Sequence, residues 1–277
     1  MKSILLKISI LVFALLIPKT ENLNNTPQDF QGVAYYFSKS TMDLGRWGAR
    51  FSEAQKKQIM DRMKGRLEKT YILTFNKEES MFYEEEQLDA ISGATDSWGK
   101  NFTAGKSYKN VKSNTQIQSQ EFYGKRFLVK DKLQEITWEM GSETKQIGNY
   151  TCFKATAKVP SNELTWYSFS WDKLRTAENV EQSGEQQEVK MTEVEAWYTL
   201  QIPVGHGPSE YWGLPGLILE VSAGNTTMLC SKIIMNPEER TEIEAPNKGE
   251  EITKIAYQNT IAKKMQEFRD NRGRRRR

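Results

Sequence analysis

A period-two alternation of side chains around a proline–glycine corner is the feature that most constrains this chain. Residues 196–202 alternate in polarity, which predicts a strand, and Pro203 ends it because proline has no N–H for the ladder. The apolar run 217–221 and the run 227–235 predict two more strands, joined by a tight turn at Gly224-Asn225. Parallel neighbours would need crossovers of a dozen residues or more. The sequence therefore predicts antiparallel pairing.

The rest of the chain repeats this strand pattern at short spacing. The fold class that we predict is mainly β: a curved antiparallel sheet or half-barrel, packed on its concave side by one or two helices. The further strands are expected at residues 33–37, 71–75, 81–83, 107–111, 115–122, 126–130, 136–140, 150–159 and 164–171.

Two segments have helical periodicity instead. Ser52 and Gln55 form a capping box, and Ile59, Met63 and Leu67 follow on one face, which predicts an amphipathic helix laid on an apolar surface. A second apolar stripe at helical spacing near the C-terminus predicts a helix docked on the sheet; its members are Ile252, Ile255, Tyr257, Ile261, Met265 and Phe268.

The N-terminal residues resemble a secretory leader. Lys2 and Lys7 precede the apolar run 8–17, which is shorter than the roughly 20 residues that a membrane helix needs. We expect residues 1–20 to be a signal peptide, so that the mature protein is exported to the periplasm or beyond, with no transmembrane span. No linker or repeat divides the rest of the chain, which predicts one domain over residues 21–268.

The charge of the chain is concentrated at its C-terminal end. The last ten residues contain six arginines and one aspartate, a net charge of 6 − 1 = +5, which leaves 3 − 5 = −2 for the remainder. We expect residues 269–277 to be a disordered basic tail that can contact anionic lipid or lipopolysaccharide. The nearly neutral body is not a nucleic-acid-binding surface.

The corner itself predicts a turn between two strands. Pro215 fixes φ at the first central position of a type II turn, and Gly216 is expected to supply the positive φ of the second. The segment is no phosphate cradle, because Pro215 lacks one of the N–H donors that such a cradle needs.

This region resembles the signature of the GLPGLI family. The resemblance rests on Trp197-Tyr198, Ile202-Pro203, Gly207-Pro208, Tyr211 and Gly213-Leu214-Pro215-Gly216-Leu217-Ile218-Leu219, with weaker likeness at Tyr35-Tyr36 and Ile147-Gly148. It covers most of the mature chain and implies an exported protein of Bacteroidetes-type bacteria. It implies no established activity, and no catalytic residue can be carried over.

No catalytic, metal or cofactor site is predicted. His206 is the only histidine, and between two glycines without a nucleophile motif it is expected to be a solvated turn residue. One histidine and two distant cysteines do not supply zinc spacing. After export, Cys152 and Cys230 form either one disulfide or two buried thiols on separate strands.

Three functions remain open, and the first is preferred. A curved sheet lined by Trp166, Trp197, Tyr198 and Trp212 would suit a non-enzymatic binding or carrier protein of the envelope with an apolar, lipid-like ligand; the alternative is that these aromatics fill the core. The second is an accessory protein that docks on an outer-membrane complex through residues 203–212, and the third is an envelope hydrolase. The residues expected to contact a ligand or partner are Trp197, Gly207, Pro208, Tyr211, Trp212, Gly213, Leu214, Pro215 and Gly216.

Overall fold

The computed structural model describes residues 30–42, 49–85, 104–167 and 189–274, which form one large sheet and three helices. The helices are α3 (Glu53–Leu67), α5 (Ser161–Leu164) and α7 (Lys254–Arg274). The strands are β1 (Gly32–Ser40), β2 (Glu68–Phe75), β3 (Glu79–Glu84), β4 (Ser107–Asn110), β5 (Thr115–Phe122), β6 (Lys125–Asp131), β7 (Glu139–Ile147), β8 (Tyr150–Pro160), β9 (Met191–Thr199), β10 (Leu217–Ala223), β11 (Thr226–Met235) and β12 (Glu250–Ile252).

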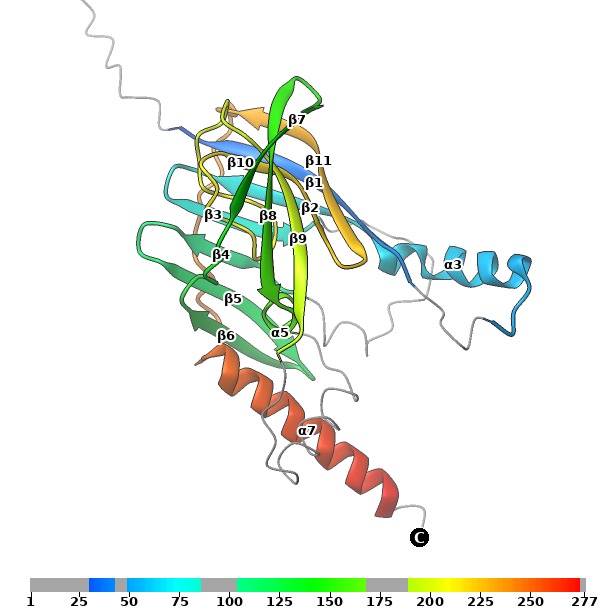
Figure 1. The fold of residues 1–277 in the computed structure, drawn as a ribbon. Coiled ribbons are helices and arrows are strands. Elements are labelled where there is room, and N and C mark those ends of the chain that lie inside the picture. The colour runs from blue at the N-terminus through cyan, green and yellow to red at the C-terminus, as the bar shows by residue number, and fades with distance from the viewer. Residues whose placement is uncertain (1–29, 43–48, 86–103, 168–188, 275–277) are drawn as a thin grey trace, which may run out of the picture.

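The strands pair in the order β12-β6-β5-β4-β3-β2-β1-β11-β10-β9-β8-β7, which leaves β12 and β7 as free edges. Every pair is antiparallel except β12 with β6, which is parallel. The sheet bends strongly, and β7, β8 and β9 cross in front of β2 to β5 (Figure 1). The predicted fold class, a mainly β protein built on a curved open sheet, is confirmed.

Three clusters of buried side chains hold the bent sheet together. Tyr36 and Phe75 of the β1–β2 pair contact a group that includes Ile202 and Leu217 at the corner. A second cluster joins the inner faces of β8, β9 and β10, and a third joins β6 to α7. Part of the corner between β9 and β10, Ile202 and Leu217 included, therefore belongs to the core, whereas Pro203, Gly213 and Pro215 are exposed.

Of the two long helices, α7 packs on the sheet and α3 does not. In α7, Tyr257, Ile261 and Met265 are buried against Phe122, Phe127 and Val129, so the predicted docking of this helix is confirmed. Helix α3 begins with the predicted capping box, but none of its residues is buried. The expectation that α3 lies on an apolar surface is wrong, because the helix projects from the end of β1 and the start of β2 (Figure 1).

Two local predictions need correction, and a third concerns residues that the structure does not describe. The strand expected at 164–171 is absent from its described part: α5 ends at Leu164 and residues 165–167 are a turn. Helix α7 continues to Arg274, into the segment 269–277 that the sequence predicts to be disordered. The predicted signal peptide at 1–20 lies outside the described residues. Among the helices that are described, none has the length and apolarity to span a bilayer.

Candidate functional site

The corner loop, residues 200–216 between β9 and β10, is buried over residues 206–208 and 210–211, while Pro203, Gly213 and Pro215 are exposed. His206 and Trp212 form a β-bridge, and the amide N–H of Gly213 donates to the carbonyl of Gly205 at 2.9 Å. The N–H of Ile218 donates to the carbonyl of His206 at 3.1 Å, which ties the loop to β10. The motif residues that the sequence singles out are therefore brought together here, with the exception of Trp197.

Glycine is required in the corner loop for two different reasons. Gly213 has φ +92, a conformation that favours glycine. Gly216 does not have the positive φ that we expected; instead, a Cβ at Gly216 would lie 2.0 Å from the carbonyl oxygen of Thr199. The predicted reason for Gly216 is thus wrong, because what it permits is close backbone approach.

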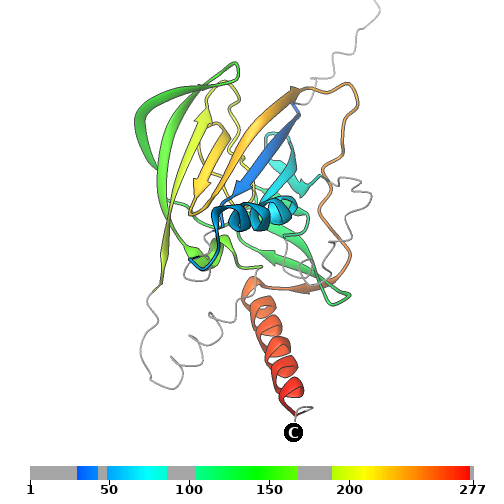
Figure 2. The same cartoon turned by 90° about the vertical axis from the view of Figure 1, so that its right-hand side faces the viewer.

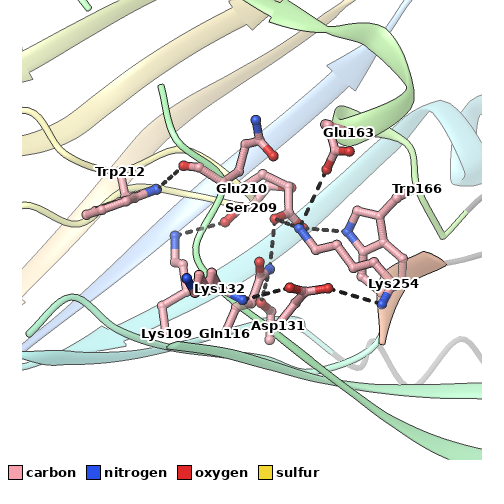
Figure 3. Close-up of polar contacts among 12 residues, drawn as sticks. Lys109, Gln116, Asp131, Lys132, Glu163, Trp166, Ser209, Glu210, Trp212 and Lys254 are labelled. Atoms are coloured by element: carbon pink, nitrogen blue, oxygen red, sulfur yellow. Dashed lines mark hydrogen bonds and ion pairs between the residues drawn. The ribbon is translucent and has the colours of Figure 1, made fainter. Parts of the chain in front are cut away.

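A buried lysine holds the corner loop against β4. The Nζ of Lys109, a fully buried side chain, donates to the carbonyl of Ser209 at 2.8 Å (Figure 3). It also donates to the carbonyls of Gly207 at 2.8 Å and Tyr211 at 3.1 Å. Ser209 has φ +48, so the backbone is strained where it presents its carbonyl. Burial lowers the pKa of Lys109 to about 8, with Glu210 acting in the opposite direction. The side chain is therefore still an ammonium at neutral pH, with an acceptor for each of its protons.

Glu210 is the buried anion of the same loop. Its Oε1 accepts from the indole N–H of Trp166 at 3.1 Å, and its Oε2 accepts from the amide of Gln116 at 2.8 Å. The ammonium of Lys254 lies 3.7 Å from the same Oε2 (Figure 3). The carboxylate is thus held by the segment after α5, by β5 and by α7 at once, which fixes it as an ion-paired group inside the fold.

Lys254 links the C-terminal helix to this cluster. Its ammonium also lies 3.9 Å from Glu163 and 5.6 Å from the ring centre of Trp166. Its backbone N–H donates to Asp131 at 3.3 Å. Because Lys254 is the first residue of α7, the start of the helix is anchored to both β6 and the corner loop.

Two tryptophans close the outer side of the corner loop. The indole of Trp138 donates to the carbonyl of Trp212 at 2.8 Å, and the indole of Trp212 donates to the carbonyl of Gln134 at 2.6 Å. These two bonds fasten residues 134–138 across the loop. Trp212 is half-buried, whereas Tyr211 and Pro208 are buried.

His206 is a buried neutral residue, so the prediction of a solvated turn residue is wrong. It is fully buried, its ring centre lies 6.3 Å from that of Phe75, and neither ring nitrogen has a hydrogen-bond partner of normal geometry. Burial, and then the Lys109 ammonium, lower the pKa of His206 to about 3, against a small opposing effect from the backbone of Asn76. A neutral imidazole without a nearby nucleophile has no acid–base partner at this position.

The inner face of β5 contains a row of buried glutamines beside this cluster. Gln116, Gln118 and Gln120 are at most 4% exposed. Among the residues that the structure describes, none is a hydrogen-bond partner of Gln116 Oε1, Gln118 Oε1 or Gln120 Nε2, nor of the hydroxyl of Tyr257 on α7. These side chains give the interior between β5 and α7 an unused capacity for hydrogen bonds.

The aromatic side chains predicted to line one cavity are dispersed. Trp166, Trp197 and Tyr198 belong to three different core clusters. The indole of Trp197 donates to Glu195 at 2.9 Å, and the ammonium of Lys145 lies 4.2 Å from its ring centre. The alternative, in which these aromatics fill the core, is the arrangement observed.

The two cysteines are buried free thiols on β8 and β11. Burial raises the pKa of Cys152 to about 11 and that of Cys230 to about 12, so both remain protonated. Of the two possibilities left open by the sequence, the structure shows separate thiols. Across the described ranges, His, Cys, Asp and Glu side chains form no group of three suited to a metal ion.

A comparison with protein families finds one match to the corner loop and its flanking strands. The model of the family described as "Protein of unknown function (Porph_ging)" matches residues 138–220, a segment that includes the hexapeptide at 213–218. No curated protein matches the chain.

Among solved structures, the chain is similar to PNGF-II in two crystal forms. The identity is 15% in both, with TM-scores of 0.49 and 0.47, over 84% and 83% of this chain. The overlap covers 32% of each PNGF-II chain, so this chain spans about a third of their length. At these values the likeness assigns no activity.

Proposed function

We propose that this chain is an exported, non-enzymatic binding protein of the cell envelope, whose ligand is a small neutral polar molecule held between β5 and α7. The GLPGLI resemblance and the leader-like residues 1–20 support export. We further infer that the GLPGLI signature and the Porph_ging match describe the same structural unit, because the matched segment contains the signature.

The row of glutamines on β5 carries the proposal. A buried polar atom without a partner costs about 1–3 kcal/mol, and four such atoms lie on this row and on Tyr257. Such groups are normally satisfied by ordered water or by a ligand. An amide row next to an aromatic cluster suits a molecule rich in hydroxyl or amide groups.

The charges of the site favour a neutral ligand over a charged or lipid-like one. Lys109, Glu210 and Lys254 already have partners, so a charged ligand would be buried without a counter-ion. An apolar ligand would leave the amides unsatisfied. The lipid-like ligand expected from the sequence is therefore replaced in this proposal by a polar one.

The glutamine atoms have no exposed surface, so entry needs motion of the elements above them. Trp166 and α7 cover this part of the sheet, and Lys254 and Glu210 join those two elements. We infer that the ligand enters when the start of α7 separates from the corner loop.

Methionine variants of the glutamines test the proposal. Native mass spectrometry of the full chain, purified gently from its native source, should detect a bound small polar molecule. Gln118→Met with Gln120→Met should lose that molecule, because methionine keeps the shape and removes the hydrogen bonds. Gln58→Met, on exposed α3, is the control and should retain it.

The proposal fails if the buried glutamine amides bind no ligand and only lower the stability of the fold. In that case the double variant binds no less of the molecule than the wild type does, and its unfolding midpoint is higher. Export is tested separately by the intact mass of protein recovered outside the cytoplasm, which should lack the leader residues.

The two other functions have less support. Docking through residues 203–212 is disfavoured because His206, Gly207, Pro208 and Tyr211 are buried. For a hydrolase, Glu163 and Glu210 do converge, but both face the ammonium of Lys254, which lies between them as a salt-bridge partner.

A further inference from the structure

Helix α7 is longer than the sheet can cover. Its buried stripe runs through Tyr257, Ile261 and Met265, and the next member, Phe268, is 45% exposed. At about 1.5 Å per residue, the part after Met265 extends some 14 Å beyond this packing. The helix projects from the body in both views (Figure 1 and Figure 2).

An exposed aromatic pair lies where α7 leaves the sheet. The ring centres of Phe268 and Tyr123 are 5.1 Å apart, and Tyr123, in the turn between β5 and β6, is 47% exposed. Two half-exposed rings from distant segments thus form one surface at the edge of the molecule. Aromatic side chains of this kind favour the boundary between water and lipid.

Basic side chains surround this aromatic pair. Lys264 lies one helical turn before Phe268 and has 52% of its side chain exposed; Arg269 follows with 43% exposed. At the start of β6, next to the turn, the side chains of Lys125 and Arg126 are 58% and 66% exposed. Each of these four cations has an acidic neighbour: Lys264 lies 2.8 Å from Glu267, Arg269 3.6 Å from Asp270, Lys125 2.7 Å from Glu250 and Arg126 3.9 Å from Glu121.

The charge remains positive after those pairs are counted. Residues 263–277 contain eight lysines and arginines against two acidic residues, a net charge of 8 − 2 = +6. The remainder of the chain therefore has a net charge of 3 − 6 = −3. A cationic projection with an aromatic anchor on an acidic body would meet an anionic surface end-on.

We propose that the projecting end of α7 and the β5–β6 turn form a docking surface for anionic phospholipid membranes. The aromatic pair of Tyr123 and Phe268 would enter the headgroup region, while Lys264 and Arg269 pair with lipid phosphates. This surface is separate from the glutamine row, so it stands independently of the proposed ligand.

Vesicle co-sedimentation of the full chain tests the docking surface. The protein should bind phosphatidylcholine vesicles that contain phosphatidylglycerol, and not vesicles of phosphatidylcholine alone. Lys264→Gln with Arg269→Gln should weaken binding about 25-fold, at about fivefold per charge near the surface. Phe268→Ser with Tyr123→Ser should weaken it by about tenfold through loss of apolar contact.

Matched controls use the opposite part of the surface. Phe37 and Leu229 are also exposed apolar side chains, and they face each other across β1 and β11. Phe37→Ser with Leu229→Ser, and Lys39→Gln with Lys158→Gln, should bind as the wild type does. Circular dichroism of each variant checks that the fold is retained.

Three outcomes would overturn the proposal. One is no binding to either kind of vesicle, and another is equal binding to both. The third is full affinity of the serine variant together with weakened affinity of the glutamine variant, which would identify a general polyanion site instead of a lipid surface.

Discussion

Lys109 places an ammonium among buried side chains, where an unpaired charge costs several kcal/mol. Its three carbonyl partners all belong to the corner loop. The lysine therefore holds in place a loop whose backbone groups would otherwise lie unsatisfied against β4.

Replacement of this lysine should be costly. We expect Lys109→Met to lower the free energy of unfolding by about 3–5 kcal/mol, because three carbonyls lose their donor and Glu210 loses a nearby cation. Urea denaturation measures the change. Lys112→Met is the control: it removes an exposed lysine from the same region and should leave the unfolding midpoint unchanged. Equal midpoints for both variants would contradict the assigned role.

At the scale of residues, the sequence predicts partners poorly. The strand at 115–122 is predicted, but not which of its faces is buried: the structure has Gln116, Gln118 and Gln120 buried and Ile117 half-buried. The polar covering of that face, Glu210 and Trp166, comes from distant segments. The prediction for His206 is wrong for the same reason, because its burial depends on Phe75 and on how the corner loop turns inward.

At the scale of elements, the two strands around the corner meet at Gly216. The backbones of Thr199 and Gly216 approach so closely that a methyl group has no space. Gly65 in α3 has nothing within 4 Å of the corresponding position. The two glycines thus form a matched pair for substitution by alanine.

Gly216→Ala and Gly65→Ala should have opposite effects. The first should reduce the free energy of unfolding by about 1–3 kcal/mol through overpacking. The second should raise it by up to about 1 kcal/mol, because alanine is the better helix former. Thermal unfolding followed by circular dichroism distinguishes them, and a stable Gly216→Ala protein would show that the loop can rearrange.

Elements themselves are predicted well where a local rule sets them. The capping box of α3 and the Gly224-Asn225 hairpin are confirmed. Of the apolar stripe predicted for α7, Tyr257, Ile261 and Met265 are buried, whereas Ile255 and Phe268 are exposed and Ile252 lies in β12. The strand predicted at 164–171 is wrong over its described residues, 164–167. The aromatic residues there have high β-propensity, but Trp166 packs on Tyr257 of α7 at 5.8 Å between ring centres.

At the scale of the whole molecule, the buried imidazole makes stability depend on acidity. The pKa of His206 is lowered to about 3 in the folded state, from about 6.5 in an unfolded chain. Between these values the unfolded state binds the additional proton, so stability is lost as the pH falls.

The size of this effect can be isolated by comparison with a variant. Between pH 6 and pH 4, the wild type should lose about 1.4 kcal/mol per pH unit more than His206→Gln does. Subtracting the pH dependence of the variant from that of the wild type removes the contribution of the carboxylates that both proteins share. Parallel stability curves for the two proteins would show that His206 is not buried in its neutral form.

For the whole molecule, the sequence predicts the fold class but not the order of the strands in the sheet. Short spacing between strands indicates antiparallel neighbours, and the single parallel pair, β12 with β6, follows a long connection that local patterns do not resolve. Nor do local patterns indicate that β1 lies between β2 and β11.

That position of β1 has a consequence for how the protein acquires its structure. Ser40 and Thr226, which bond across β1 and β11, are 186 residues apart in sequence. During synthesis, β1 cannot pair with β11 until most of the chain has been made. A topology of such high contact order folds slowly. If the chain is exported as proposed, slow folding would keep it unfolded for translocation.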